Sequence, residues 1–107
     1  MENHILEKKK SLSLFISKIA KLYFIAKEKC GSGEIHDVTD NNDYFVFITR
    51  VERAFDQLTD IEKEFINNDF FYEAYPNWWK KYYSRSNYYR IRKMSMLSFK
   101  EAFDHGA

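Results

Sequence analysis

The hydrophobic positions of this chain recur at intervals of three, four and seven residues, which is the repeat of one face of an α-helix. The first stripe begins at Ile5 and predicts a helix over about residues 3–29. A second stripe begins at Tyr44 and predicts a helix over about residues 41–57. The chain has only three glycines and one proline, so few positions favour the turns of a β-sheet.

Polar residues at the ends of these stripes predict where the helices stop and start. Gly31 is placed to end the first helix, and Asp40 or Asn42 can cap the second. Thr59 and Glu62 have the spacing of a capping box, in which each side chain bonds to the backbone of the other residue. The sequence LTDIEKEFI therefore predicts the start of a third helix.

The last part of the chain predicts two helices joined by a short polar turn. Pro76 favours a helix start, which gives a fourth helix over about residues 76–83. Ser84 and Ser86 can each cap a fifth helix over about residues 85–104. Two helices joined by a tight polar turn have the sequence shape of a helix-turn-helix.

The whole pattern predicts an all-α fold, a small bundle of about five helices. It divides the chain into an amphipathic helix over residues 1–30 and a helical domain over residues 40–107, with the helix-turn-helix at about 76–104. The first helix can pack on the same core, or it can act as an arm that docks a partner or forms a homodimer. Its lysine run at 8–10 also allows it to lie on a membrane surface.

Composition supports a folded chain in a reducing setting. Apolar residues make up 45% and aromatic residues 19% of the sequence, which is enough to build a core and argues against a disordered chain. Cys30 is the only cysteine, so no disulfide can form within the chain, and a cytoplasmic location is expected. No apolar run approaches the ~20 residues of a membrane span, so no membrane partner is expected.

The net charge of +1 hides an uneven distribution of charged residues. Residues 31–75 hold eleven acidic and three basic side chains, whereas residues 76–100 hold seven basic side chains and no acidic one. The basic end can face phosphates, and the acidic middle can face a basic protein surface.

The fifth predicted helix separates into two faces of different chemistry. Tyr88, Ile91, Ser95 and Met96 share the inner face. The outer face supplies six DNA-binding candidates: Arg85, Ser86, Asn87, Tyr89, Arg90 and Lys93. Arginine can donate two hydrogen bonds to guanine, asparagine can pair with adenine, and serine, lysine and the helix N-terminus can hold phosphates. Lys80, Lys81 and Arg92 are expected to neutralise the DNA backbone.

Other residue types carry no recognisable chemistry. His4, His36 and His105 are far apart, and none has metal-ligand spacing with another histidine or with Cys30. The glycines of CGSGEIH lack the spacing of a phosphate-binding loop. No enzyme activity, metal or cofactor is therefore expected. The aromatic residues of the predicted fourth helix are expected to pack in the core; they are Trp78, Trp79, Tyr82 and Tyr83.

The sequence YSRSNYYRIRKMSMLSF, at 83–99, resembles the recognition helix of bacterial sigma-factor region four. It is closer still to phage, firmicute or mollicute transcriptional regulators of the ArpU kind, and LTDIEKEFI is similar to the helix that opens region four. The resemblance covers about residues 55–103. It departs from the family pattern at Trp78 and Trp79, where small apolar residues are common, and the turn lacks its usual glycine.

This resemblance implies a transcription regulator that reads duplex DNA through a helix-turn-helix and contacts RNA polymerase through the acidic segment at 34–73. Two other functions stay open. A helical protein–protein adaptor would bind RNA polymerase or another partner through its aromatic residues, without DNA readout. A helical RNA-binding protein would prefer RNA over duplex DNA.

Overall fold

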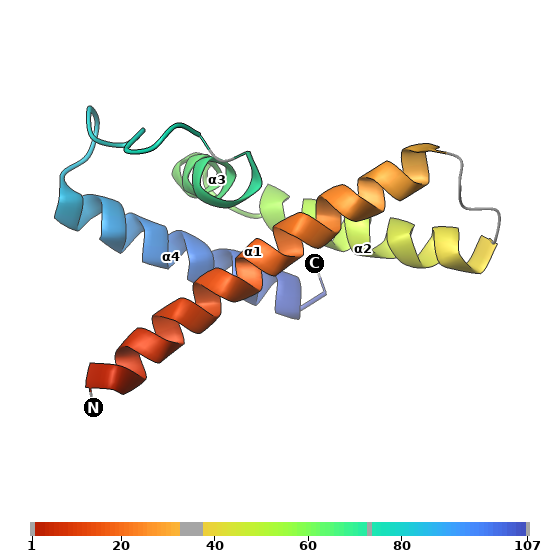
Figure 1. The fold of residues 1–107 in the computed structure, drawn as a ribbon, viewed down its shortest axis with the longest axis horizontal. Helices are drawn as coiled ribbons and strands as arrows, with labels where there is room; N and C mark the ends of the chain where they lie inside the picture. Colours follow the sequence, from red (N-terminus) through yellow and green to blue (C-terminus); the bar gives the residue numbers. More distant parts are fainter. Residues whose placement is uncertain (1, 33–37, 73, 107) are drawn as a thin grey trace.

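The computed structural model describes residues 2–32, 38–72 and 74–106, and within these residues the fold is all-α (Figure 1). The helices are α1 (Glu2–Ser32), α2 (Val38–Asp56), α3 (Asp60–Ile66) and α4 (Arg85–Asp104), with a π-helical turn, η1 (Asn67–Phe71), directly after α3. In Figure 1, α1 crosses the molecule diagonally, with α2 towards one end, and α3 and α4 towards the other. The prediction of an all-α fold is confirmed, with four α-helices rather than about five in this part of the chain.

The first two helices are longer than their sequence signals predicted. α1 continues through Gly31, and α2 begins at Val38, so Asp40 and Asn42 lie inside it rather than at its cap. A glycine inside a helix costs only about 1 kcal/mol relative to alanine, so it favours a stop without compelling one. The predicted ends of both helices were therefore wrong by a few residues.

α1 belongs to the main hydrophobic core. Its inner face buries Ile16, Ile19, Tyr23 and Ala26 against residues of α2, η1 and α4. These partners include Val51, Ala54, Phe70, Met96 and Phe99. Of the placements that the sequence left open for the first helix, the structure has the one in which it packs on the common core.

The capping box at the start of α3 is confirmed. The Thr59 hydroxyl accepts a hydrogen bond from the backbone N–H of Glu62, and a Glu62 carboxylate oxygen accepts one from the backbone N–H of Thr59. The other oxygen of Glu62 accepts from the Ser98 hydroxyl at 2.6 Å, which connects α3 to α4.

The predicted helix at 76–83 is wrong, because residues 75–82 form successive turns instead. Asn77 has a left-handed backbone conformation with φ of 62°, which stops a right-handed helix at its first turn. Short-range bonds follow, such as Lys80 N–H to the Asn77 carbonyl at 3.1 Å. The next residue, Trp78, is buried. α4 is therefore not preceded by a helix and a tight turn.

Candidate nucleic-acid interface

The start of α4 is held against α3 by a small aromatic core. Its buried members are Phe65 of α3, Trp78 of the turn segment and Tyr88 of α4. The rings of Phe65 and Trp78 meet edge to face with centroids 5.1 Å apart. Trp79 stacks on Tyr88 with centroids 4.3 Å apart and an interplanar angle of 14°. Such aromatic contacts fix the direction in which the N-terminal half of α4 points.

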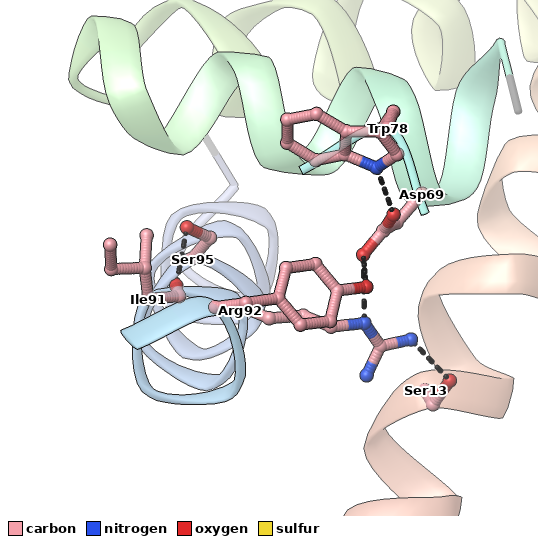
Figure 2. A network of polar contacts seen from close by, with 7 residues as sticks. Ser13, Asp69, Trp78, Ile91, Arg92 and Ser95 are labelled. Carbon is pink, nitrogen blue, oxygen red and sulfur yellow. Dashed lines mark hydrogen bonds and ion pairs between the residues drawn. The ribbon is translucent and has the colours of Figure 1, made fainter. Parts of the chain in front are cut away.

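Asp69 of η1 joins this aromatic core to α4 through three hydrogen bonds (Figure 2). One carboxylate oxygen accepts from the Trp78 indole N–H at 2.8 Å. The other accepts from the Tyr88 hydroxyl at 2.5 Å and from Nε of Arg92 at 2.9 Å. Burial and the neighbouring carboxylate of Asp69 raise the pKa of Tyr88, so its hydroxyl keeps its proton and remains a donor.

Arg92 has a different position from the other basic residues of α4. Its partly buried guanidinium lies between Asp69 and Ser13 of α1, to whose hydroxyl it donates at 3.4 Å (Figure 2). It also lies over the ring of Phe70, 4.9 Å from the centroid. The charge expected to neutralise a phosphate is instead paired with a carboxylate of the same chain.

The N-terminus of α4 is capped from within the chain. Ser84 has an extended backbone, and its hydroxyl accepts a hydrogen bond from the backbone N–H of Asn87 at 3.2 Å. Of the two predicted caps, Ser84 is the one used, and Ser86 lies inside the helix. No acidic residue stands in the first turn, so the positive end of the helix dipole has no compensating carboxylate from its own turn.

All six candidates on the outer face of α4 are exposed, as predicted: Arg85, Ser86, Asn87, Tyr89, Arg90 and Lys93. The Arg90 guanidinium reaches the side-chain oxygen of Asn87 at 3.5 Å, and the Tyr89 ring rests edge-on against Tyr88. The face therefore presents arginine, amide, hydroxyl and ammonium donors together, on a helix braced from behind.

Lys80 and Lys81 are also exposed, on the turns that lead into α4. The neighbouring aromatic residues divide by position. Trp78 is buried, and Trp79 and Tyr83 pack against the aromatic core, as predicted. Tyr82 is 74% exposed, so its predicted packing was wrong, because the turns leave its side chain on the solvent side.

An acidic residue borders this surface. The Tyr83 hydroxyl donates to the carboxylate of Glu64 at 3.2 Å. Burial and the charge of Glu64 raise the pKa of Tyr83. Since Glu64 lies on α3, it marks where the basic surface of α4 meets the acidic middle of the chain.

Sequence reasoning missed the residues that hold this surface in place. Asp69 and Glu62 each join α4 to an earlier segment, and both lie in the acidic middle that was expected to face a partner. Only the capping role of Glu62 had a local signal, because a capping box is defined by spacing.

Two further findings concern metal ligands and membrane-spanning helices in the part of the chain that the structure describes. Among the described residues, no three His, Cys, Asp or Glu side chains are grouped to hold a metal ion. The side chain of His4 and all of His36 lie outside the described residues. No helix found in the described ranges is both long and apolar enough to span a membrane.

No family model, curated protein or solved structure gives a significant match to this chain.

Proposed function

We propose that this chain is a transcription regulator that binds duplex DNA through the N-terminal half of α4. One observation carries the proposal: this helix exposes a face of donors, within a stretch, residues 76–100, that has no acidic residue. A merely solvated helix face usually mixes both signs of charge. An acid-free basic face is the electrostatic footprint of a surface that binds phosphate backbones.

The side chains divide into two roles at this surface. Arg85, Asn87 and Arg90 have the donors and acceptors that read base edges in the major groove. Ser86, Tyr89 and Lys93, with Lys80 and Lys81 on the preceding turns, have the donors that hold phosphates. Arg92 supports the surface from within through Asp69 and is not assigned a DNA contact.

Within this class of transcription regulators, the sequence resemblance alone supports a helix-turn-helix like that of sigma-factor region four. In place of a preceding helix and a tight turn, α4 is braced by the aromatic core and by Asp69. Contact of the acidic segment at 34–73 with RNA polymerase also rests on that resemblance.

The proposal is tested by fluorescence anisotropy with random duplex DNA at several salt concentrations. About four to six phosphate contacts give a log–log slope of roughly −4 to −5 for the affinity against salt. Most sites in random DNA offer Arg85 and Arg90 no matching base, so both arginines contact phosphates there. The Arg85→Ala/Arg90→Ala variant should therefore bind more weakly and should lower that slope by about 2. The matched control is Lys21→Ala/Arg53→Ala, which removes the same charge from exposed positions on α1 and α2 and should change the affinity much less.

Equal losses in the two double variants would show that net charge, and not this face, drives binding. Tighter binding to single-stranded or structured RNA would favour the RNA-binding alternative. An absence of salt-sensitive binding to any nucleic acid would contradict the proposal.

The alternative function, a protein–protein adaptor, has a specific observation of its own. Several large apolar side chains are exposed on α1 and α2: Leu14, Leu22, Ile25, Phe45 and Val46. Buried apolar surface is the usual source of protein–protein affinity, and such an interface depends little on salt.

A homodimer would use the same side chains. Sedimentation equilibrium of the wild type beside a Leu22→Ser/Ile25→Ser variant distinguishes a dimer from a monomer, because only the variant lacks the two apolar side chains.

A further inference from the structure

A cleft of about 400 Å³ lies between α1, α2 and η1, and no residue of α4 lines it. Its lining residues are Tyr23, Val51, Glu52, Phe55, Asp56, Asn67, Phe71 and Tyr72. The cleft is thus separate from the proposed DNA-binding surface, and its function does not depend on that proposal.

Aromatic rings form much of the cleft wall. Tyr23 and Phe71 meet edge to face with centroids 5.7 Å apart. Phe24 extends this cluster and contacts Tyr72, again edge to face, at 5.7 Å. Tyr72 is 69% exposed and stands where the cleft meets solvent. Aromatic faces carry negative electrostatic potential, so a wall of rings attracts cations as well as apolar groups.

The π-helical turn supplies one side of this wall. The Tyr72 N–H bonds to the Asn67 carbonyl at 2.8 Å, five residues back, so the turn is wider than an α-helical one. Asn67, Phe71 and Tyr72 all line the cleft. Single π-turns within helices occur often at functional sites, because they reposition side chains at a cost to regular packing.

Two carboxylates add negative charge to the same cleft. Glu52 accepts a hydrogen bond from the Tyr23 hydroxyl at 2.7 Å, and Lys27 lies 3.5 Å from the same carboxylate oxygen. Asp56 also lines the cleft, and its carboxylate makes no hydrogen bond or ion pair within the described residues. It is the last residue of α2, where the negative end of the helix dipole strengthens attraction for a cation.

The chain's own lysines show that rings of this cleft accept ammonium groups. Nζ of Lys27 lies 5.7 Å from the centroid of the Tyr23 ring. Nζ of Lys63 lies 5.8 Å from the centroid of the Phe55 ring. Both rings line the cleft, so two of its aromatic rings already contact ammonium groups of the chain.

We propose that this cleft binds an organic ammonium ion with an apolar body. The ammonium group lies between Asp56 and Glu52, and the body packs against the rings of Phe55, Phe71 and Tyr72. The ligand competes with Lys27 for Glu52, while Asp56 is open to it. A free small amine and the lysine side chain of a partner peptide share this chemistry.

The test is a titration of the isotope-labelled chain, followed by amide NMR. Phenethylammonium represents the free amine, and capped N-acetyl-lysine N-methylamide represents the peptide lysine. 2-Phenylethanol is the neutral control of similar shape. Both cationic probes are expected to shift the amides around residues 51–56 and 67–72, and the stronger of the two identifies the source of the ligand.

Three substitutions separate the contributions. Asp56→Asn should weaken binding roughly tenfold, which corresponds to the loss of a hydrogen bond to a charged group. Lys27→Met should strengthen binding severalfold, because it removes the internal competitor for Glu52. Asp60→Asn, an exposed carboxylate in the first turn of α3, is the control and should leave affinity unchanged.

Equal binding of 2-phenylethanol and phenethylammonium would overturn the assignment of a cation site. So would an Asp56→Asn variant that binds as the wild type does, or an absence of localised shifts with either amine up to millimolar concentrations. None of these results would alter the DNA-binding measurement, because the cleft and the α4 surface share no residue.

Discussion

At the scale of single residues, two carboxylates connect α4 to the rest of the protein. Asp69 accepts from Trp78, Tyr88 and Arg92, and Glu62 accepts from the backbone of its own cap and from Ser98. A carboxylate that accepts several hydrogen bonds leaves several donors unsatisfied when it is removed.

The first prediction concerns Asp69. Asp69→Ala should lower the free energy of unfolding by about 2–4 kcal/mol, because it leaves an arginine and two aromatic donors unpaired in a largely buried setting. Urea denaturation measures this loss. Asp43→Ala, at an exposed position of α2, should stay within about 0.5 kcal/mol of the wild type. Similar results for the two variants would contradict the assigned role of Asp69.

A second prediction follows from the ionisation of Glu62. Burial opposes its charge, but hydrogen bonds from Ser98 and Thr59 outweigh burial and hold the pKa of Glu62 below its ordinary value of 4.5. A lowered pKa in the folded state stabilises the protein above the unfolded value, and this stabilisation is lost as the pH falls through the folded value. The Glu62 carboxylate therefore stabilises the fold at neutral pH but not in strong acid.

Urea denaturation of Glu62→Gln across pH 2–7 tests this expectation. The stability advantage of the wild type over the variant should be present above about pH 5 and should shrink as the pH falls below 4.5. Glu101→Gln, on the exposed face of α4, is the matched control for the loss of one carboxylate. A wild-type advantage that stays constant through the acid range would argue against the lowered pKa.

Residue pairing also marks a limit of sequence reasoning. The exposed and buried faces of α4 follow from its 3.6-residue period, so the outward position of Arg85 and Arg90 could be predicted. The inward position of Arg92 could not, because its partner Asp69 lies in a separate segment that only the tertiary fold brings near.

At the scale of elements, the cap signals at the starts of α3 and α4 were correct, whereas the one at the start of α2 was not. The caps at Thr59 and Ser84 use hydrogen bonds spanning three residues, so the sequence alone contains them. The turns at 75–82 could not be predicted from such local signals. Pro76 favours a helix, but the left-handed Asn77 and the burial of Trp78 against Phe65 determine the backbone there.

The cap at Ser84 gives the third prediction. Ser84→Ala should lower the free energy of unfolding by about 1 kcal/mol, because the N–H of Asn87 loses its acceptor. Ser86→Ala removes an identical hydroxyl two residues later and should have little effect on stability. Thermal unfolding followed by circular dichroism compares the two variants. A larger loss of stability for Ser86→Ala than for Ser84→Ala would contradict the assignment of the cap to Ser84.

At the scale of the whole molecule, α1 shares one hydrophobic core with α2, η1 and α4. The amphipathic stripe of α1 predicted an inner face, but not its partner, since a stripe can equally meet a second copy or another protein. Only the tertiary structure shows that this face of α1 packs against other helices of the same chain.

A fourth prediction tests this common core. Ile16 is 0% exposed, so Ile16→Ala should cost about 2–5 kcal/mol. Because the core is shared, far-UV and near-UV circular dichroism should shift to lower denaturant together, in one transition. Leu14→Ala, on the exposed side of α1, should cost far less. Separate transitions for the two signals would indicate that α1 unfolds independently.

The small aromatic core behind α4 has a practical consequence. The chain has two tryptophans: Trp78 lies in that core, and Trp79 packs against it. One indole is hydrogen-bonded to Asp69, and the other is stacked on Tyr88. Intrinsic fluorescence excited at the indole band is therefore a label-free optical signal confined to the half of the molecule that presents the basic face, and it can follow ligand encounters there in real time.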